Sequence, residues 1–326
     1  MINWQKKSNK RRYQSIINRK ILFSQGYDIY CQADNQTSNK IISIPHKFYN
    51  QYHILNRLIR QGIHNVLLLN DDKTILVIKH WILIIENGKI INKHRIPKGS
   101  RPTRCGICIL PDKSIIYADY WSNPGCIPVN LYISKDLGES WQILWTSKEN
   151  FARHIHFVCP VVNSSKYIYF GTGDYGAEPG IYKMNVDTKK IITIGKGTQK
   201  WRAVSVLQRD NKLIWGTDCE YDKNYIYSLG LDSNEIIKLA ELPGPAYYST
   251  IDKNDVMYIG TTIEDRKNHR ACILKSINGK EWVIHKEFKK DIWHSKYFGY
   301  GIIEFVHGQE NHEQLFYNLV GLKEIK

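Results

Sequence analysis

The sequence predicts an all-β fold, a β-propeller built from four-stranded antiparallel blades. Two observations lead to this prediction: a short strand that ends in a small residue recurs along the chain, and a polar turn precedes each copy. The clearest copies place Gly171, Gly216 and Gly260 at intervals of 45 and 44 residues. This interval matches the length of one propeller blade.

Each repeat is predicted to contain the same four strands. An inner strand is followed by a polar turn, such as 111–113 or 209–212, with residues typical of hairpins. The strand that ends in a small residue comes next, then a longer polar loop and a third strand that turns into an outer fourth strand. The inner strands are expected at 64–70, 103–110, 153–162, 201–208, 246–251 and 301–306.

The two ends of the chain are expected to close the ring. Five repeats fill residues 64 to about 295 and leave strand-like stretches at 20–44 and 301–326. We expect these stretches to form one blade together, because pairing of N- and C-terminal strands removes exposed strand edges. This gives six blades. Seven blades are the alternative, if residues 21–44 form a blade of their own.

Charge and composition define the domain organisation. Hydrophobic residues make up 42% of the 326 residues, which excludes a disordered chain. The net charge is +15, but seven Lys and Arg lie in the first twenty residues with no acidic residue among them. We interpret 1–20 as a solvated basic tail and 21–326 as a single propeller with a short helix near 48–61. This distribution argues against a nucleic-acid partner, although an anionic glycan, a membrane surface or nucleic acid could contact the tail.

The sequence carries no sign of export or membrane insertion. No apolar run approaches 18 residues, and the N-terminus lacks the apolar segment of a secretory signal. The seven cysteines are an odd number without the density of a disulfide framework. Cys105 and Cys108 are three apart on a predicted strand and face opposite ways, which argues against a zinc or redox site. We therefore expect a cytoplasmic protein without a membrane span.

One turn motif indicates a family. Residues 134–141, Ser-Lys-Asp-Leu-Gly-Glu-Ser-Trp, match the Asp-box pattern S-x-D-x-G-x-x-W, and 276–282 is a shorter version with Asn in place of Asp. Asp187 and Asp232 hold the corresponding turn in two other repeats. Over residues 64–300 the chain resembles the sialidase-like Asp-box, or BNR-repeat, propellers, which include bacterial glycosyl hydrolase-like proteins. The resemblance implies that the boxes are structural and face away from the active site.

The topology predicts which face carries the chemistry. Because strands alternate in direction, the starts of the inner strands meet the loops between the second and third strands on one face. The opposite turns hold ordinary Asn, Asp, Lys and Ser. The inner-strand starts contribute Arg101, Arg153, His154, His156, Arg202, Tyr247 and Tyr248, and the loops contribute Asp119, Tyr120, Trp121, Asp174, Glu178, Asp218, Glu220 and Glu264.

The arginines predict an anionic ligand. Arg101, Arg153 and Arg202 come from consecutive repeats, and guanidinium groups bind carboxylates through two hydrogen bonds. We expect them to bind an acidic glycan together with Asp218 and Trp121. The alternative is that these arginines pair with acidic residues and only brace the loops.

The resemblance to sialidases also implies catalytic roles. Such enzymes use a tyrosine nucleophile assisted by a Glu, with an Asp as the acid. Here Tyr247 or Tyr248 would be the nucleophile, with Glu178 and either Asp174 or Asp119 as partners.

Two histidines leave further alternatives open. His154 and His156 are two apart on a strand and therefore share a face. They would bind substrate or act as a base, and Tyr248 would assist in a uronate lyase. We assign no metal ligand and expect no cofactor, with a divalent metal at these histidines, completed by Gln199 or Asp174, as the minor alternative. The leading hypothesis is a glycoside hydrolase acting on a carboxylate-bearing glycan. The alternatives are a uronate-type lyase and a non-catalytic glycan- or protein-binding propeller.

Overall fold

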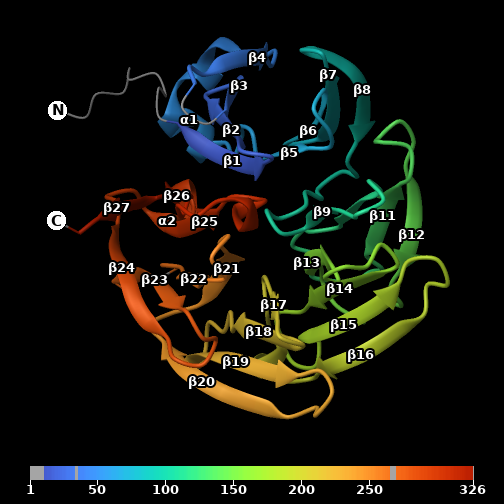
Figure 1. The fold of residues 1–326 in the computed structure, drawn as a ribbon, viewed down its shortest axis with the longest axis vertical. Helices are drawn as coiled ribbons and strands as arrows, with labels where there is room; N and C mark the ends of the chain where they lie inside the picture. Colours follow the sequence, from blue (N-terminus) through green and yellow to red (C-terminus); the bar gives the residue numbers. More distant parts are fainter. Residues whose placement is uncertain (1–10, 34–35, 265–268, 326) are drawn as a thin grey trace.

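The sheets lie around a ring (Figure 1) in the computed structural model, which describes residues 11–33, 36–264 and 269–325. Six sheets contain four consecutive antiparallel strands, which we call blades 1 to 6. Blade 1 contains β1 (Arg12–Ile17), β2 (Lys20–Gln25), β3 (Asp28–Ala33) and β4 (Asn39–Ser43). Blade 2 contains β5 (Asn65–Leu68), β6 (Lys73–Ile78), β7 (Trp81–Glu86) and β8 (Lys89–Arg95). Blade 3 contains β9 (Ile107–Ile109), β10 (Ile115–Ala118), β11 (Asn130–Ser134) and β12 (Gln142–Thr146).

The remaining blades repeat this meander. Blade 4 contains β13 (Ile155–Pro160), β14 (Tyr167–Thr172), β15 (Gly180–Asn185) and β16 (Ile191–Lys196). Blade 5 contains β17 (Leu207–Arg209), β18 (Lys212–Gly216), β19 (Asn224–Gly230) and β20 (Ile236–Leu242). Blade 6 contains β21 (Ala246–Ile251), β22 (Met257–Thr261), β23 (Arg270–Ser276) and β24 (Val283–Lys290). The predicted six blades of four antiparallel strands are confirmed.

The ends of the chain are arranged differently from the prediction. Residues 20–44 and 301–326 do not share a blade. Instead β25 (Ile302–Phe305) and β26 (Tyr317–Val320) form a two-stranded sheet, which we call the C-terminal sheet, and β27 (Leu322–Glu324) pairs with β24. This sheet lies between blade 1 and blade 6 (Figure 1). The ring therefore holds six complete blades and one incomplete one.

A local turn explains why blade 1 is complete by itself. Asn18 and Arg19 connect β1 to β2 with φ values of 46° and 62°. This two-residue turn with two positive φ angles matches strand twist and favours a hairpin. The N-terminal strand thus pairs with its sequence neighbour, and among the described residues a single β-bridge, between Ser15 and His307, joins its backbone to the C-terminal segment.

The same observation moves the domain boundary. The propeller begins at Arg12 and not at residue 21, so the second half of the expected tail is folded. Arg12 forms an ion pair with Glu304, and Lys20 forms one with Asp71. These ion pairs hold the side chains of Arg12 and Lys20 against the rest of the fold. Residues 1–10 of the expected tail lie outside the described residues.

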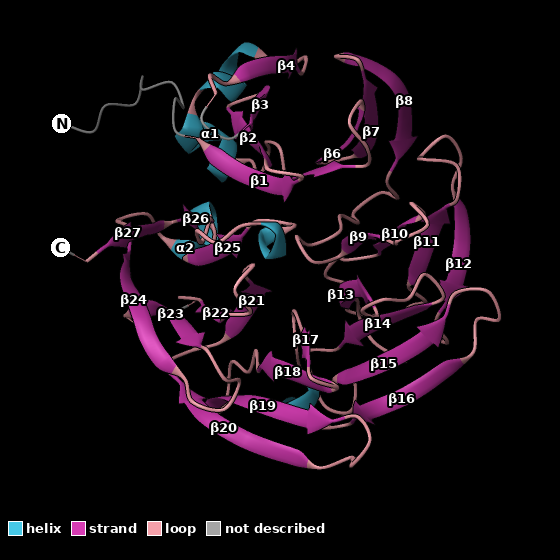
Figure 2. Ribbon diagram, in the orientation of Figure 1, coloured by secondary structure: helices cyan, strands magenta, loops and turns pink. Residues whose placement is uncertain are grey.

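Helices are few and short (Figure 2). The expected helix near 48–61 corresponds to the 3-10 helix η1 (Phe48–Gln51) and to α1 (His53–Leu58). The others are η2 (Gln199–Trp201), α2 (Ser295–Phe298) and η3 (Gln309–Asn311). Within the described ranges, no helix has the length and apolar character needed to cross a membrane.

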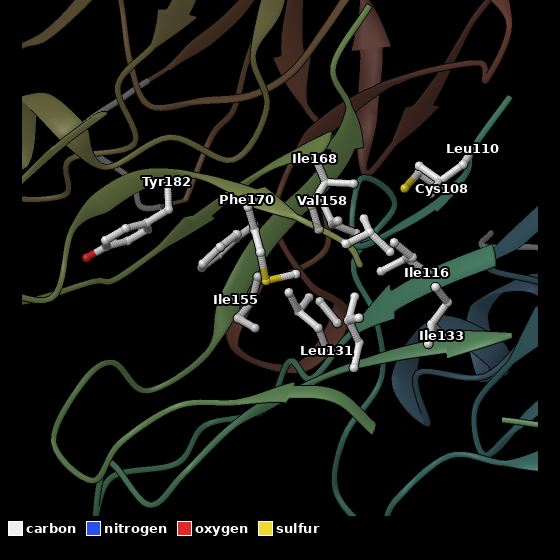
Figure 3. Close-up of a cluster of buried hydrophobic side chains, with 14 of the residues drawn as sticks. Cys108, Leu110, Ile116, Leu131, Ile133, Ile155, Val158, Ile168, Phe170 and Tyr182 are labelled. Carbon is white, nitrogen blue, oxygen red and sulfur yellow. The ribbon is translucent and has the colours of Figure 1, made fainter. Parts of the chain in front are cut away.

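The hydrophobic core lies between adjacent blades. Figure 3 shows the contact of blades 3 and 4, where Ile116 and Leu131 of one sheet meet Val158 and Phe170 of the next. All four are at most 2% exposed. Alternate residues of each strand point toward one neighbouring blade, and the intervening residues point toward the other. Buried hydrophobic clusters join each pair of consecutive blades from 1 to 6, and blade 6 to the C-terminal sheet.

The Asp box joins two blades through a tight turn between β11 and β12. The Asp136 carboxylate accepts a hydrogen bond from the Ser140 backbone at 2.9 Å, and Gly138 has a φ of 88°. Trp141 stacks on His94 of blade 2 with 4.9 Å between ring centroids. Hydrogen bonds from Ser140 lower the pKa of Asp136 to about 2. The box therefore organises the turn and packs blade 3 against blade 2.

Candidate functional site

A cavity of about 1020 Å³ opens on the face predicted to carry the chemistry. Inner-strand starts and the loops between second and third strands line it, because the antiparallel order of each blade brings these segments together. The Asp-box turns connect third to fourth strands, at the other end of the blades. The lining residues that bear on chemistry are Arg101, Arg104, Tyr120, His156, Asp174, Arg202, Asp218, Glu220, Tyr247 and Tyr248.

A cluster around Asp174 lies at this cavity. His154 and His156 come from the start of β13, and Asp174 comes from the loop between β14 and β15. The Nε2 atoms of the two histidines are 2.9 Å apart, and each lies 3.2 Å from an Asp174 carboxylate oxygen. Both imidazoles are buried. Three groups with lone pairs therefore converge on one point.

Backbone carbonyls fix the orientation of both imidazoles. His154 Nδ1 lies 2.8 Å from the Trp121 carbonyl oxygen, and His156 Nδ1 lies 3.2 Å from that of Ala203. Because a carbonyl oxygen only accepts, each Nδ1 carries the proton in these bonds. Burial lowers the pKa of His156 to about 4, so this imidazole is neutral at pH 7.

The guanidinium of Arg202 forms ion pairs with three acidic side chains. Its Nη2 lies 3.1 Å from Asp174 Oδ1 and 3.2 Å from Glu220 Oε1, and its Nε lies 3.3 Å from Asp218 Oδ2. The other oxygen of Asp218, Oδ1, is buried without a hydrogen-bond partner. Burial raises the pKa of Asp218 well above its usual value, although Arg202 opposes the shift. Arg202 thus neutralises several carboxylates at the cavity.

The other two arginines differ in their surroundings. Arg153 lies 3.5 Å from Glu178 and 4.3 Å from the ring centroid of Tyr175, and it is not among the cavity-lining residues. Arg101 lines the cavity and donates to the Arg60 carbonyl oxygen, with His64 Nε2 at 3.0 Å. Across the described ranges, no carboxylate forms an ion pair with Arg101. The three guanidinium groups therefore do not form one equivalent cluster.

The two candidate tyrosines are adjacent at the cavity. The Tyr247 hydroxyl donates a hydrogen bond of 2.5 Å to Glu264 Oε1. Burial raises the pKa of both groups, so the carboxylate is a stronger base than an exposed glutamate. Tyr248 is 9% exposed and lines the same cavity.

The other predicted site residues have partners outside the cavity. Asp119 is 3% exposed and accepts hydrogen bonds from Ser100 and Asn130 at 2.8 and 3.0 Å. Glu178 contacts Arg153 and accepts from its backbone amide. Trp121 contributes its carbonyl oxygen to His154. None of the three is among the residues that line the cavity.

Three cavity or near-cavity residues were placed on the predicted face by the sequence but were given no role there. Tyr120 is 38% exposed, and its ring centroid lies 4.3 Å from that of His154. Glu220 and Glu264 lie in the second-to-third-strand loops of blades 5 and 6. Their position in the repeat indicates the site, because all three lie in loops between second and third strands, as Asp174 does.

Comparisons with known proteins support the fold. The chain matches a prolyl endopeptidase structure with a TM-score of 0.61 and 9% identity over 97% of this chain. It matches a puromycin-hydrolysing peptidase of Mycobacterium tuberculosis with a TM-score of 0.58 and 9% identity over 88% of this chain. The chain has a β-propeller fold.

These similarities do not extend to a family. TolB from Acinetobacter baumannii matches with a TM-score of 0.50 and 12% identity, covering 83% of this chain and 61% of TolB. The chain spans 47% and 46% of the two peptidases. No family model matches, and no curated protein sequence is significantly similar. The matched structures are not specific to sialidase-like propellers.

Proposed function

We propose that this propeller is a glycoside hydrolase that binds a carboxylate-bearing glycan in the cavity described above. The observation that carries the proposal is that Arg101, a cation without a described carboxylate partner, lines the same cavity as Tyr247, whose hydroxyl donates a hydrogen bond to Glu264. One group would bind the anionic part of the sugar, and the pair would attack the glycosidic bond.

Arg101 is suited to bind an anion. Its side chain is half-buried, so binding a carboxylate would remove little additional water from the guanidinium. Burial lowers its pKa, and Tyr248 and Tyr120 are close enough to oppose this effect. These aromatic rings would pack against the apolar face of a sugar. A sugar carboxylate at Arg101 would therefore orient the ring beside the tyrosines.

The Tyr247–Glu264 pair supplies a nucleophile and its base. Glu264 would accept the phenolic proton while the Tyr247 oxygen attacks the anomeric carbon. The glycosidic oxygen would leave with a proton from the buried carboxyl group of Asp218. Water would then cleave the tyrosyl–sugar bond, giving one proton to Asp218, while the proton on Glu264 returns to Tyr247. Tyr247, Glu264 and Asp218 all end in their starting states.

A uronate lyase is the second candidate, and the position of His156 favours it. This imidazole lines the cavity, and its Nδ1 proton is engaged by the Ala203 carbonyl, so Nε2 would remove the proton beside a uronate carboxylate. The elimination breaks the bond to the leaving sugar and forms a carbon–carbon double bond.

A panel of anionic glycans tests these proposals. Reducing ends and ultraviolet absorbance are followed together, since only elimination produces an absorbing unsaturated uronate. New reducing ends without absorbance, lost in Tyr247→Phe, would support the hydrolase. Both signals, retained in Tyr247→Phe, would support the lyase. Neither signal across the panel, with glycan binding still detected by calorimetry, would contradict both and favour a binding propeller.

A further inference from the structure

We propose that His154, His156 and Asp174 bind a divalent transition-metal ion at the edge of the large cavity. Their potential ligand atoms all lie within 4.8 Å of one another. Two imidazoles and one carboxylate form a donor set that first-row transition metals accept. This inference goes beyond the proposed hydrolase, because cleavage by Tyr247 and Glu264 involves none of these three side chains.

The hydrogen bonds at Nδ1 of both histidines leave their Nε2 atoms as the potential metal ligands. Because both Nδ1 atoms donate to carbonyl oxygens, the atom of each ring that is left to bind a cation through a lone pair is Nε2. These lone pairs face each other and the Asp174 carboxylate at 2.9 to 3.2 Å. Electron-rich atoms this close repel one another unless a cation or a proton lies between them. The same Nδ1–carbonyl contacts orient metal-binding histidines generally.

The distances agree with binding of one ion. Two ligand atoms that bind a metal at about 2.1 Å, at right angles to each other, lie about 3.0 Å apart. The Nε2–Nε2 distance is 2.9 Å, and both Nε2–carboxylate distances are 3.2 Å. The three atoms therefore suit three adjacent positions around one metal ion.

The remaining positions would be open to the cavity. His156 and Asp174 both line it, as does Tyr120, which lies beside the two imidazole rings. Three protein ligands with open positions are the arrangement of a catalytic rather than a purely structural metal. A bound ion would thus be accessible to water or to a ligand in the cavity.

Neighbouring groups hold the carboxylate in place and balance the charge. Gln199 donates to the Asp174 backbone carbonyl at 2.9 Å, and Arg202 contacts the carboxylate at 3.1 Å. The positive charge of Arg202 would disfavour a metal, but Glu220 Oε1 lies 3.2 Å from the same guanidinium. The negative charge of Glu220 offsets part of this repulsion.

Cobalt binding tests the site. Chelator-treated full-length protein is titrated with Co²⁺, followed by visible absorption and calorimetry. We expect one equivalent to bind with the absorption of nitrogen-ligated Co²⁺, and Zn²⁺ to displace it. His156→Gln is expected to weaken binding at least tenfold. His285→Gln, which changes an exposed histidine on β24, is the matched control and should bind like the unchanged protein.

Stability measurements separate loss of the site from loss of the fold. Metal-free thermal unfolding of each variant shows whether it folds, and Co²⁺ should raise the Tm of the unchanged protein and of His285→Gln but not of His156→Gln. If His156→Gln does not fold, the test rests on the unchanged protein: binding of one Co²⁺ per chain, with the absorption of nitrogen-ligated Co²⁺, supports the site. Absence of Co²⁺ and Zn²⁺ binding to that protein, or equal binding by a folded His156→Gln, overturns the proposal and leaves a shared proton between the imidazoles.

Discussion

Arg12 and Glu304, near opposite ends of the chain, form a two-pronged ion pair. Arg12 Nη2 lies 2.8 Å from both carboxylate oxygens, and Nε lies 3.2 Å from one of them. The pair links β1 to β25, which share no strand ladder. Arg104, which is buried, donates to the carbonyl oxygens of Gln14 and Phe305. Side chains therefore supply much of the closure that strand pairing was expected to provide.

Removal of Arg12 should destabilise the fold. In Arg12→Met, the carboxylate of Glu304, which is 8% exposed, would keep its charge but lose this partner. Breaking such a pair costs about 3 kcal/mol. Urea unfolding measures the change. Lys20→Met, which removes an exposed pair with Asp71, should cost less than about 1 kcal/mol. Equal small losses in both variants would show that the Arg12 pair behaves like a surface contact.

The same pair predicts a pH dependence. Burial alone would raise the pKa of Glu304, but Arg12 and Arg104 together lower it below 4.5. A carboxylate with a depressed pKa in the folded state stabilises the fold above its unfolded pKa and loses that contribution as pH falls through the folded value. The free energy of unfolding should therefore fall more steeply below about pH 4.5 in the unchanged protein than in Glu304→Gln. Parallel curves would contradict this.

Substitution of Gly138 in the Asp box, compared with Gly197 outside it, distinguishes the cost of backbone strain from the cost of a packing clash. Gly138 and Gly197 have φ values of 88° and 87°, but a Cβ on Gly138 would lie 2.3 Å from Ile84 Cδ1, whereas nothing lies within 4 Å at Gly197. Each Ala variant should lose about 1–3 kcal/mol through the positive φ. Gly138→Ala should lose more, and the excess measures the contact with blade 2. Equal losses by denaturant unfolding would mean that Ile84 adapts freely.

The parts of the molecule that could be predicted depend on short-range chemistry. The Gly-ended strands and the turn around Gly138 follow from residues a few positions apart, so the blades were predictable. Whether Arg202 is paired or free depends on Asp174, Asp218 and Glu220. These three loop residues reach Arg202 only in the folded ring. The sequence therefore indicated a face rich in charges, while the pairing of those charges required side-chain positions. Arg101 and Arg202 look alike in sequence and differ in exactly this respect.

Arg101 should matter for ligand binding, whereas Arg153 should not. Under the proposed function, Arg101→Ala removes the cavity cation that would contact a glycan carboxylate, and affinity should fall by about 10- to 100-fold. Arg153→Ala removes an arginine that contacts Glu178 and Tyr175 outside the cavity lining. Isothermal titration with an acidic oligosaccharide that binds the unchanged protein measures both. A larger loss in Arg153→Ala would place the ligand elsewhere.

Tyr247→Phe should abolish hydrolysis while the protein remains folded. The variant keeps the aromatic ring but removes the hydroxyl that donates to Glu264, so it would lose the proposed nucleophile and kcat should fall at least about 100-fold. Tyr258→Phe is the matched control, because it removes a similar hydrogen bond, from the Tyr258 hydroxyl to Asp252, at a residue that does not line the cavity. It should keep its kcat. Because burial raises the pKa of Glu264, activity should rise with pH through a value above 4.5, as this carboxyl becomes the base. Full activity in a folded Tyr247→Phe would exclude the tyrosine as nucleophile and move catalysis to another cavity residue.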